Sequence, residues 1–504
     1  MAGPAVLSTP SGFLLVLALV VPAAGSLLAL MLGGRHAERI VLALMPVGLG
    51  LAVAVAAGVL RGNAPLVYVV GAWAPPLGLA LRADGLSAAM MITTAVVICA
   101  TGLFARAEFQ TPRGVSEARA PLVFWTLLLG LWGALNAVLL GDDLFNLFVA
   151  LELLTFSAVP LVCLDGRAET LSAALRYLLF ALLGSMLYLL GTVLLYGAYG
   201  TLDIVLLSER VRAEPASLVA ATLMTVGLLA KTALFPLHLW LPPAHAGAPA
   251  PASAVLSALV VKGSFILILR LWFDVMPGLL SLPAAHLLAA LGAAAILFGS
   301  VLALRQARLK MLIAYSTVAQ IGYLFLMFPL VASPQAMQAG AGAWTGGLLQ
   351  AISHACAKAA MFMAAGLVAQ ALGHDRIAGL GGIGRALPMT MFAFALAGLS
   401  LMGVPPSGGF TAKLLLLTAA IETGQWWWAL VILAGGLLTG GYLYRVLAPA
   451  VAGTDTPLAT CAPVPRYREA VVLALALVSM VLGLLPLASF GLLHIGRLDM
   501  GISP

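Results

Sequence analysis

Four lysines of this sequence stand inside long apolar stretches, where a charged side chain is least expected. All 20 arginines, by contrast, lie in loops or at the ends of those stretches, as does the fifth lysine, Lys310. Arginine stays protonated under essentially all conditions, whereas burial can shift a lysine toward its neutral form. A chain whose buried side chains must gain and lose protons would use lysine at those positions. The restriction of lysine to apolar stretches and of arginine to loops therefore indicates proton transfer. The four lysines are Lys231, Lys262, Lys358 and Lys413.

One acidic side chain stands in equally apolar surroundings. Glu152 lies deep in the run that begins at Asp142 and Asp143, whereas those two aspartates are typical caps of a helix N-terminus. A central Lys or Asp costs about 2.5–3.5 kcal/mol on membrane-insertion scales, so five such groups would cost roughly 12–17 kcal/mol. Snorkelling or a static ion pair is the alternative for each group taken alone. The total favours a function for Glu152 and the four lysines.

Three histidines accompany these charges. His354 lies four residues before Lys358, so the two share one helical face. A relay role for His354 is predicted because an unperturbed histidine titrates at about pH 6.5; the alternative is a packing role. His238 and His245 flank the segment Trp240-Leu241-Pro242-Pro243. We treat both as relay candidates, with ordinary loop histidines as the alternative.

The elements that must position these side chains are membrane helices. The 504 residues are 62% hydrophobic and only 9% charged, whereas a globular protein carries about 25% charged residues. A spanning helix needs about 20 mostly apolar residues. Fourteen such stretches are predicted, and they begin near Gly12, Ile40, Leu86, Pro121, Leu144, Leu171, Ser217, Ser253, Ala284, Met311, Trp344, Pro388, Trp426 and Ala470. The segment Pro65–Asp84 is predicted to form a hairpin-like loop.

Two of the predicted spans, the seventh and the twelfth, are interrupted by proline. Pro236 follows Lys231 in the seventh, and the segment Gly403–Gly409 precedes Lys413 in the twelfth. Proline frees backbone carbonyls, which a membrane tolerates only where protein or water satisfies them. Each break therefore predicts local water beside a lysine.

Broken spans in corresponding positions are typical of transporters with internal repeats. We therefore expect an all-α polytopic membrane protein with two inverted five-helix repeats. The predicted units are residues 1–119 with three helices, residues 120–273 and 284–452 as the two repeats, and residues 466–504 with the last helix.

Basic residues in the loops predict the orientation, because cytoplasmic loops carry an excess of Lys and Arg. Loops after odd-numbered spans hold fifteen basic residues and the opposite loops hold six. Both termini are therefore predicted on the non-cytoplasmic side of an inner (plasma) membrane of a bacterial-type cell. The net charge of +7 is read as an orientation signal and not as a nucleic-acid-binding surface, since no basic stripe interleaved with aromatic residues is present.

Several kinds of site are not indicated. The four cysteines, Cys99, Cys163, Cys356 and Cys461, are widely spaced, so neither a metal site nor a disulfide framework is expected. The glycine-rich segment Gly379–Gly384 follows no predicted strand, which argues against a nucleotide site. We expect no cofactor and no catalytic residue of a redox or hydrolytic enzyme.

Taken together, the motifs resemble one family. Between about Pro121 and Leu447 the chain is similar to the antiporter-like subunits shared by respiratory complex I, Mrp-type cation/proton antiporters and membrane-bound hydrogenases, and within them most similar to the D-type subunits of Mrp antiporters. The stretch from Pro243 to Pro251 is more similar to the hydrogenase and complex I members. The motifs are Phe-Asn-Leu-Phe ahead of Glu152, Lys-Thr-Ala-Leu-Phe-Pro-Leu-His-Leu-Trp-Leu-Pro from Lys231, Leu-Lys-Met-Leu-Ile-Ala-Tyr-Ser-Thr-Val-Ala-Gln-Ile-Gly-Tyr from Leu309 to Tyr323, His354 with Lys358, and Gly-Val-Pro-Pro-Ser-Gly-Gly-Phe-Thr-Ala-Lys ending at Lys413.

The resemblance implies a proton-conducting subunit with a hydrophilic axis at the membrane midplane. Glu152 would pair with Lys231, Lys262 and the His354/Lys358 pair would continue the axis, and Lys413 would serve the second half. It further implies other membrane subunits as partners and proton movement coupled to exchange of sodium or potassium. Proton pumping in a complex I-type or hydrogenase assembly is the first alternative. A quinone-binding redox subunit and an assembly scaffold with fixed ion pairs are the others.

Overall fold

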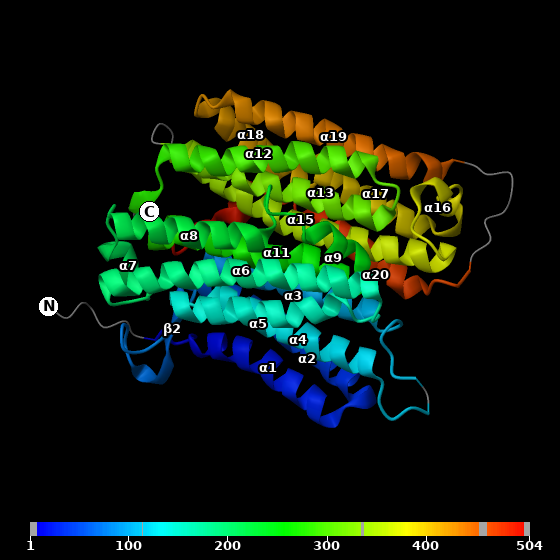
Figure 1. The fold of residues 1–504 in the computed structure, drawn as a ribbon, viewed down its shortest axis with the longest axis horizontal. Helices are drawn as coiled ribbons and strands as arrows, with labels where there is room; N and C mark the ends of the chain where they lie inside the picture. Colours follow the sequence, from blue (N-terminus) through cyan, green and yellow to red (C-terminus); the bar gives the residue numbers. More distant parts are fainter. Residues whose placement is uncertain (1–7, 113, 334–336, 453–460, 498–504) are drawn as a thin grey trace.

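The helices of the computed structural model lie side by side with roughly parallel long axes, from α1 at one edge to α19 at the opposite edge (Figure 1). The structure describes residues 8–112, 114–333, 337–452 and 461–497. The predicted all-α polytopic class is confirmed, since 79% of the chain is helical. The two chain termini, which are predicted to face the non-cytoplasmic side, lie outside the described residues.

The elements follow the chain in this order. The first part contains α1 (Phe13–Leu32), α2 (Gly34–Gly62), β1 (Leu66–Val69), η1 (Val70–Ala72), β2 (Ala80–Ala83), α3 (Gly85–Ala105), α4 (Arg119–Leu140), α5 (Leu144–Val162), α6 (Ala168–Tyr199), α7 (Ile204–Arg210) and α8 (Pro215–Thr232). The middle part contains α9 (Leu241–Gly247), α10 (Ala250–Val255), η2 (Leu256–Val260), α11 (Val261–Leu269), η3 (Arg270–Val275), η4 (Pro277–Leu279), α12 (Leu282–Arg305), α13 (Leu309–Phe325) and α14 (Met327–Val331). The last part contains α15 (Met337–Leu372), η5 (Ile377–Gly379), α16 (Ile383–Ala386), α17 (Pro388–Met402), α18 (Gly408–Glu422), α19 (Trp426–Val451), α20 (Arg466–Val481) and η6 (Leu487–His494).

Twelve helices among the described residues are long and apolar enough to cross a membrane. They coincide with twelve of the fourteen predicted spans. The two other predicted spans contain shorter helices. The twelfth predicted span consists of α17 and α18, of 15 residues each, with the break between them, and the fourteenth is α20, of 16 residues. The count of fourteen therefore stays a prediction, while each predicted span does contain helix.

Both predicted breaks are present. Helix α8 ends at Thr232, where Ala233 adopts a left-handed backbone with φ of 58°. Helix α17 ends at Met402, where Gly403 has φ of 88°, and α18 starts after Ser407, whose hydroxyl accepts a hydrogen bond from the Phe410 amide at 3.1 Å. A residue in this left-handed region ends a helix and leaves its last carbonyls free for other partners.

The hairpin-like loop is confirmed as a two-stranded antiparallel sheet. Strands β1 and β2 pair from Leu66 with Ala83 to Val69 with Ala80. Asp84 follows β2 directly and caps α3, since its carboxylate accepts from the Ser87 amide at 2.8 Å. The hairpin therefore fixes Asp84 at the start of a buried helix.

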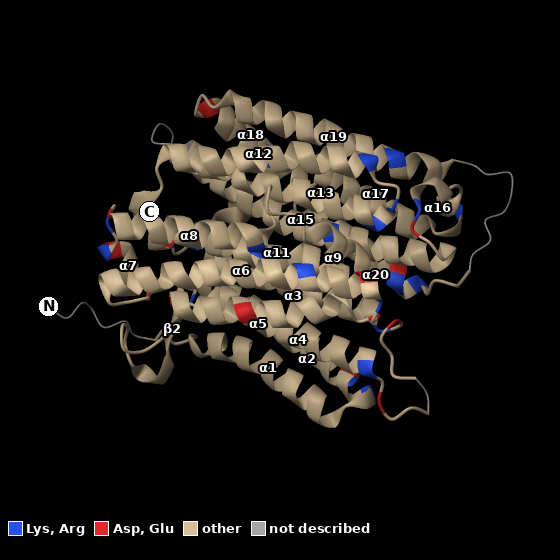
Figure 2. Ribbon diagram, viewed as in Figure 1, with Lys and Arg blue, Asp and Glu red and all other residues tan. Residues whose placement is uncertain are grey.

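The centre of the molecule consists of the spanning segment 250–275, α13 and α15. The most apolar window of residues 250–275 is entirely buried, and those of α13 with α14 and of α15 are 89% and 83% buried, against 28% for α1. A helix that is apolar and buried all round belongs to the interior of a bundle. Charged residues gather near the two ends of the helices, and few lie along their middle (Figure 2).

Candidate functional site

The first element of the site is an ion pair between α5 and α8. Lys231 Nζ lies 3.2 Å from Glu152 Oε1, and the two side chains are only 6% and 16% exposed. Lys231 also donates to Thr155 Oγ1 at 2.9 Å, and Ser185 donates to the same Glu152 oxygen. Gly184 lets α6 approach closely, because a Cβ there would lie 2.5 Å from the Gly227 carbonyl of α8. The structure thus joins the two charges that the resemblance implied as a pair.

Hydroxyl groups lead from this pair toward the central segment. Thr232, next to Lys231, donates to Ser264 Oγ at 3.0 Å. A small cavity beside the pair is lined by Thr155, Lys231 and Ser264 among others. Ser264 stands two residues after Lys262, so the α8 break and the Lys262 helix share this polar contact.

Lys262 is completely buried and binds backbone rather than a carboxylate. Its Nζ donates to the Ser257 carbonyl at 2.5 Å. Ser257 belongs to the π-helical turn η2, whose wide winding gives i→i+5 contacts and is frequent at functional sites. The Ser257 hydroxyl lies 2.9 Å from Thr317 Oγ1 of α13. Lys262 is thereby connected to the next helix of the centre.

Lys358 is bound to the same part of α13. Its Nζ donates to the Ile313 carbonyl at 3.0 Å and to the Ser316 hydroxyl. Thr317 Oγ1 donates to that same Ile313 carbonyl at 3.0 Å. One carbonyl is therefore shared by Lys358 and Thr317, and the Thr317 hydroxyl contacts Ser257, whose own carbonyl binds Lys262.

Lys413 occupies the broken end of α17. Its Nζ donates to the Leu401 carbonyl at 2.6 Å and the Met402 carbonyl at 3.2 Å, and it lies 4.1 Å from the centre of the Tyr323 ring. Gln320, one turn after Ser316 on α13, donates to the same Leu401 carbonyl at 3.1 Å. Lys413 is thus held by helix-end carbonyls and an aromatic face, both of which favour a cation.

Two of the three predicted histidines lie within this buried region. Neither ring nitrogen of His354 or of His245 has a hydrogen-bond partner among the described residues, and both rings are at most 1% exposed. His245 lies between the rings of Trp240 and Phe362, with centroids 6.2 and 6.0 Å away. His238 is packed against Phe235 and Phe298 instead. Unpartnered imidazoles in a buried place need an explanation, which a transferable proton or a bound water would give.

The candidate site therefore combines one carboxylate, Glu152, with four buried lysines. Within the parts of the chain that the structure describes, Lys231 alone among the four lysines has a carboxylate partner. Lys262, Lys358 and Lys413 each bind neutral oxygens of Ser257, Ile313 with Ser316, and Leu401 with Met402. Over the same described ranges, no group of three or more His, Cys, Asp or Glu side chains could hold a metal ion. Neutral ligands can hold either protonation state of an amine, which suits proton transfer.

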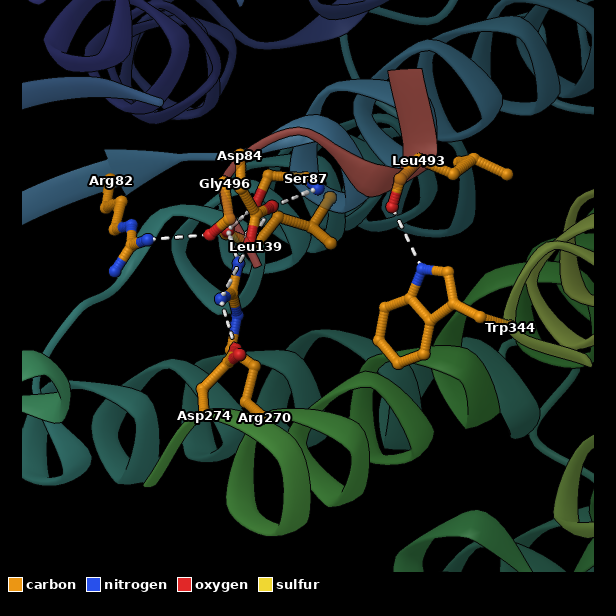
Figure 3. A network of polar contacts seen from close by, with 9 residues as sticks. All are labelled: Arg82, Asp84, Ser87, Leu139, Arg270, Asp274, Trp344, Leu493 and Gly496. Atoms are coloured by element: carbon orange, nitrogen blue, oxygen red, sulfur yellow. Dashed lines mark hydrogen bonds and ion pairs between the residues drawn. The ribbon is translucent and has the colours of Figure 1, made fainter. Parts of the chain in front are cut away.

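A second buried charge cluster lies at the end of the helices and was missed by the sequence reasoning (Figure 3). Arg270, predicted at the end of a span, is 4% exposed and lies 3.2 Å from Asp84 and 3.1 Å from Asp274. It also donates to Ser87 Oγ at 2.7 Å. Burial alone would raise the pKa of Asp84, but the Arg270 and Arg82 charges hold it below its ordinary value. The signal that could have found this cluster is Asp274, four residues after Arg270 on the same helix face.

The same cluster holds the C-terminal segment in place. Arg82 donates to the Gly496 carbonyl at 2.7 Å, and the Trp344 indole donates to the Leu493 carbonyl at 2.9 Å (Figure 3). The Gly85 amide donates to the Ile495 carbonyl at 2.9 Å. Residues at opposite ends of the sequence are therefore connected at this end of the bundle.

Asp142, at the same end of the bundle, gives a testable pH dependence. Asp143 caps α5 as predicted, whereas Asp142 is 4% exposed, and burial raises its pKa to about 7, against 3.8 for the ordinary carboxyl. The folded protein then holds this proton more tightly than the unfolded chain, so stability falls as the pH rises from about 4 to 7 and stays lower above that. We expect Asp142→Asn to weaken this fall. Thermal unfolding of both forms at pH 5.5 and pH 8 measures it, and equal pH effects in the two proteins would contradict the assignment.

The comparisons with known proteins agree with this geometry. A family model described as NADH:quinone oxidoreductase/Mrp antiporter, TM, matches residues 141–439. The chain is 34% identical over 446 residues to the N-type subunit of the NADH-quinone oxidoreductase of Desulforudis audaxviator, with 86% of each chain covered. It is 30% identical over 438 residues to the D-type subunit of the Na(+)/H(+) antiporter of Alkalihalophilus pseudofirmus, with 84% of each chain covered.

A solved structure has the same fold over nearly the whole length. A chain of the Mrp complex from Dietzia sp. DQ12-45-1b matches with a TM-score of 0.86 and 26% identity, and 96% of both chains is covered. The family model covers more than half of the chain, including Glu152, Lys231, Lys262, Lys358 and Lys413. The chain therefore belongs to the NADH:quinone oxidoreductase/Mrp antiporter family of membrane subunits.

Proposed function

We propose that this chain is a proton-translocating subunit of a multisubunit membrane complex and that protons move along the line from Glu152 to Lys413. The observation that carries the proposal is the set of four buried lysines, with polar contacts between the helices that hold them. Hydrogen bonds between their helices run beside each lysine: Thr232, next to Lys231, contacts Ser264; Ser257, which binds Lys262, contacts Thr317, and Thr317 shares the Ile313 carbonyl with Lys358; Gln320 shares the Leu401 carbonyl with Lys413. Family membership supports the same conclusion.

In this proposal the Glu152–Lys231 pair receives or gives up a proton first. Loss of the Lys231 charge removes its attraction to Glu152, and the changed field alters how readily Lys262 and Lys358 hold a proton. His354 and His245 relay protons beside them, and His238 is a further relay candidate near the α8 break. Lys413 completes the transfer in the second half. Moving one charge across 100 mV is worth about 2.3 kcal/mol, which one buried ion pair can supply by opening.

The two-repeat organisation is part of the same proposal. Residues 120–273 and 284–452 form the inverted repeats, and residues 1–119 and 466–504 flank them. Each repeat has one broken span with a lysine at the break, Lys231 before the first and Lys413 after the second. In this arrangement the two breaks give the two half-channels, and both termini face the non-cytoplasmic side of the inner membrane.

We propose a monovalent cation/proton antiporter as the host complex, with other membrane subunits as partners and sodium or potassium as the exchanged ion. The match to the Mrp complex at a TM-score of 0.86 supports this host. The second candidate is a complex I-type NADH-quinone oxidoreductase, which the 34% identity to the oxidoreductase subunit of Desulforudis audaxviator favours. Purification of the complex from its native membrane distinguishes the two, since redox subunits would accompany only the second.

The test of proton translocation uses the assembled complex in sealed vesicles. We expect Glu152→Gln to lower proton flux at least about tenfold, because the neutral amide can neither form an ion pair with Lys231 nor take up a proton. A pH-sensitive dye inside the vesicles measures the flux. Glu422→Gln is the matched control, since Glu422 is exposed at the end of α18 and lies outside the line. Wild-type flux in Glu152→Gln vesicles would overturn the proposal.

A further inference from the structure

Lys358 and Lys413 share no ligand among the residues that the structure describes. Lys358 binds Ile313 and Ser316 of α13, whereas Lys413 binds the last carbonyls of α17. A change in the protonation of one amine therefore reaches the other either through the electric field or through the side chains between their ligands. Those side chains belong to α13 and to α19, which runs along the edge of the bundle (Figure 1).

One face of α13 contacts both lysines. Ser316, Gln320 and Tyr323 follow one another at helical spacing, so their side chains project from the same side of α13. The Ser316 hydroxyl binds Lys358. Gln320 donates at 3.1 Å to a carbonyl that also binds Lys413, and the centre of the Tyr323 ring lies 4.1 Å from the Lys413 Nζ. Lys358 is thus bound near one end of this face and Lys413 near the other.

A matching face of α19 lies against these residues. It consists of three positions at helical spacing, Gly435, Thr439 and Tyr442. Gly435 lies at the level of Tyr323, because a Cβ at Gly435 would be 2.2 Å from the Tyr323 hydroxyl. Thr439 Oγ1 accepts from Gln320 at 3.5 Å. The two faces therefore run in opposite directions, which places the third position of α19 at the level of Ser316.

The Tyr442 hydroxyl lies between the ligands of the two lysines. The side chain is 0% exposed, and its hydroxyl donates to Thr439 Oγ1 at 3.3 Å. Its other hydrogen-bonding neighbours are the side chains of Gln320 and Ser316. One hydroxyl group thus contacts the serine that binds the first lysine and the amide that shares a carbonyl with the second.

We propose that Tyr442 is a positioning residue that couples the protonation of Lys358 to that of Lys413. The proposal rests on the proton-translocating function proposed above. While Lys358 is protonated, Ser316 accepts a hydrogen bond from it and donates to the Ile313 carbonyl at 2.8 Å. An ammonium group has no acceptor, whereas a neutral amine has one. The Ser316 hydroxyl can therefore turn and donate to Lys358 once the proton has left.

This turn changes the contact between Ser316 and the Tyr442 hydroxyl, and Tyr442 transmits the change to Gln320. Gln320 and Lys413 share one carbonyl. The strength with which Lys413 holds its proton then depends on the state of Lys358. No proton passes through the phenol in this scheme, so Tyr442 is unchanged after each cycle.

The first experiment removes only the hydroxyl. We expect Tyr442→Phe to lower proton flux about tenfold in vesicles that contain the assembled complex, because the ligands of the two lysines are no longer held in register. The ring still fills its place, so the yield of complex should stay close to that of the wild type. Tyr444→Phe is the matched control, because it makes the same change on the same helix at a side chain that is 72% exposed.

A double-mutant cycle separates coupling from a loss of packing. We expect Ser316→Ala alone to lower flux about tenfold, and the double variant with Tyr442→Phe to lie within about twofold of the slower single variant, since both changes interrupt the same path. Independent defects would multiply to a loss of about a hundredfold, and that result would overturn the proposal.

A second replacement retains the hydroxyl in case Tyr442→Phe fails to assemble. 3-Fluorotyrosine in place of Tyr442 keeps the ring and makes the hydroxyl a stronger donor. We expect flux to change at least about twofold with this replacement, and to stay unchanged when Tyr444 is replaced in the same way. Equal flux for the two fluorinated proteins would contradict a role for the Tyr442 hydroxyl.

The outcomes distinguish this inference from the proposed function. Wild-type flux in Tyr442→Phe overturns the coupling role, and a loss of flux in Glu152→Gln would still uphold proton translocation. Wild-type flux in both variants would reject the two proposals together.

Discussion

Lys231→Met is expected to abolish proton flux, with a loss of at least about a hundredfold in vesicles that contain the assembled complex. Methionine fills a similar volume but carries no proton and no charge. Glu152 would lose the ammonium that lies 3.2 Å from its carboxylate. Removal of one partner from a buried pair costs about 3–5 kcal/mol unless the remaining carboxyl becomes protonated. Flux and thermal unfolding of the purified complex are the two measurements.

Lys231→Arg tests whether the charge has to be switchable. Arginine can keep the pair with Glu152 but stays protonated. We expect Lys231→Arg to recover most of the stability that methionine loses and little of the flux. Arg445→Met is the control for the loss of a basic residue, because Arg445 is exposed on α19. Flux restored by arginine would mean that a fixed positive charge suffices at this position, and the transfer scheme would then be wrong.

Arg270→Met is expected to destabilise the chain strongly. It removes the guanidinium that Asp84 and Asp274 share in a nearly solvent-free place (Figure 3). Arg82 still acts on Asp84, but removal of one partner from a buried ion pair costs about 3–5 kcal/mol, so the yield of assembled protein should fall and the remaining protein should unfold at a lower temperature. The yield of complex and its unfolding temperature in detergent measure this effect.

The control for Arg270 is an arginine at the same end of the molecule. Arg212→Met changes an exposed side chain that bonds only neighbouring carbonyls, and we expect little effect. A triple change that also converts Asp84 and Asp274 to asparagine should recover part of the stability, because the two carboxylates that the Arg270 charge balances are then neutral. An Arg270→Met protein as stable as the Arg212→Met protein would show that the cluster does not hold this end together.

The type and place of the long helices could be predicted because they depend on local composition. An apolar run of about 20 residues forms a helix in lipid whatever its neighbours are. Proline positions likewise predicted the breaks after Thr232 and Met402. The restriction of Lys262 and Lys358 to apolar runs predicted their burial, and both are 0% exposed.

The partners of the buried charges could not be predicted from residue types alone. Asp84 and Arg270 are 186 positions apart, and nothing in either local sequence specifies the other. The ligands of Lys358 and Lys413 are largely backbone carbonyls, which every residue possesses. A hollow of about 570 Å³ beside Glu108 likewise arises where six separate segments of the chain meet. Such features depend on tertiary packing, which one sequence does not reveal.

The π-helical turn beside Lys262 determines which backbone carbonyl the Lys262 amine can bind. Lys262 binds the carbonyl of Ser257, five residues earlier in the same segment. In an α-helix each residue advances 1.5 Å and turns by about 100°, so sliding the wide turn by one residue would swing that carbonyl away from the amine. Conversion of this turn to α-helical winding would therefore leave the Lys262 amine without the ligand that it has in this structure.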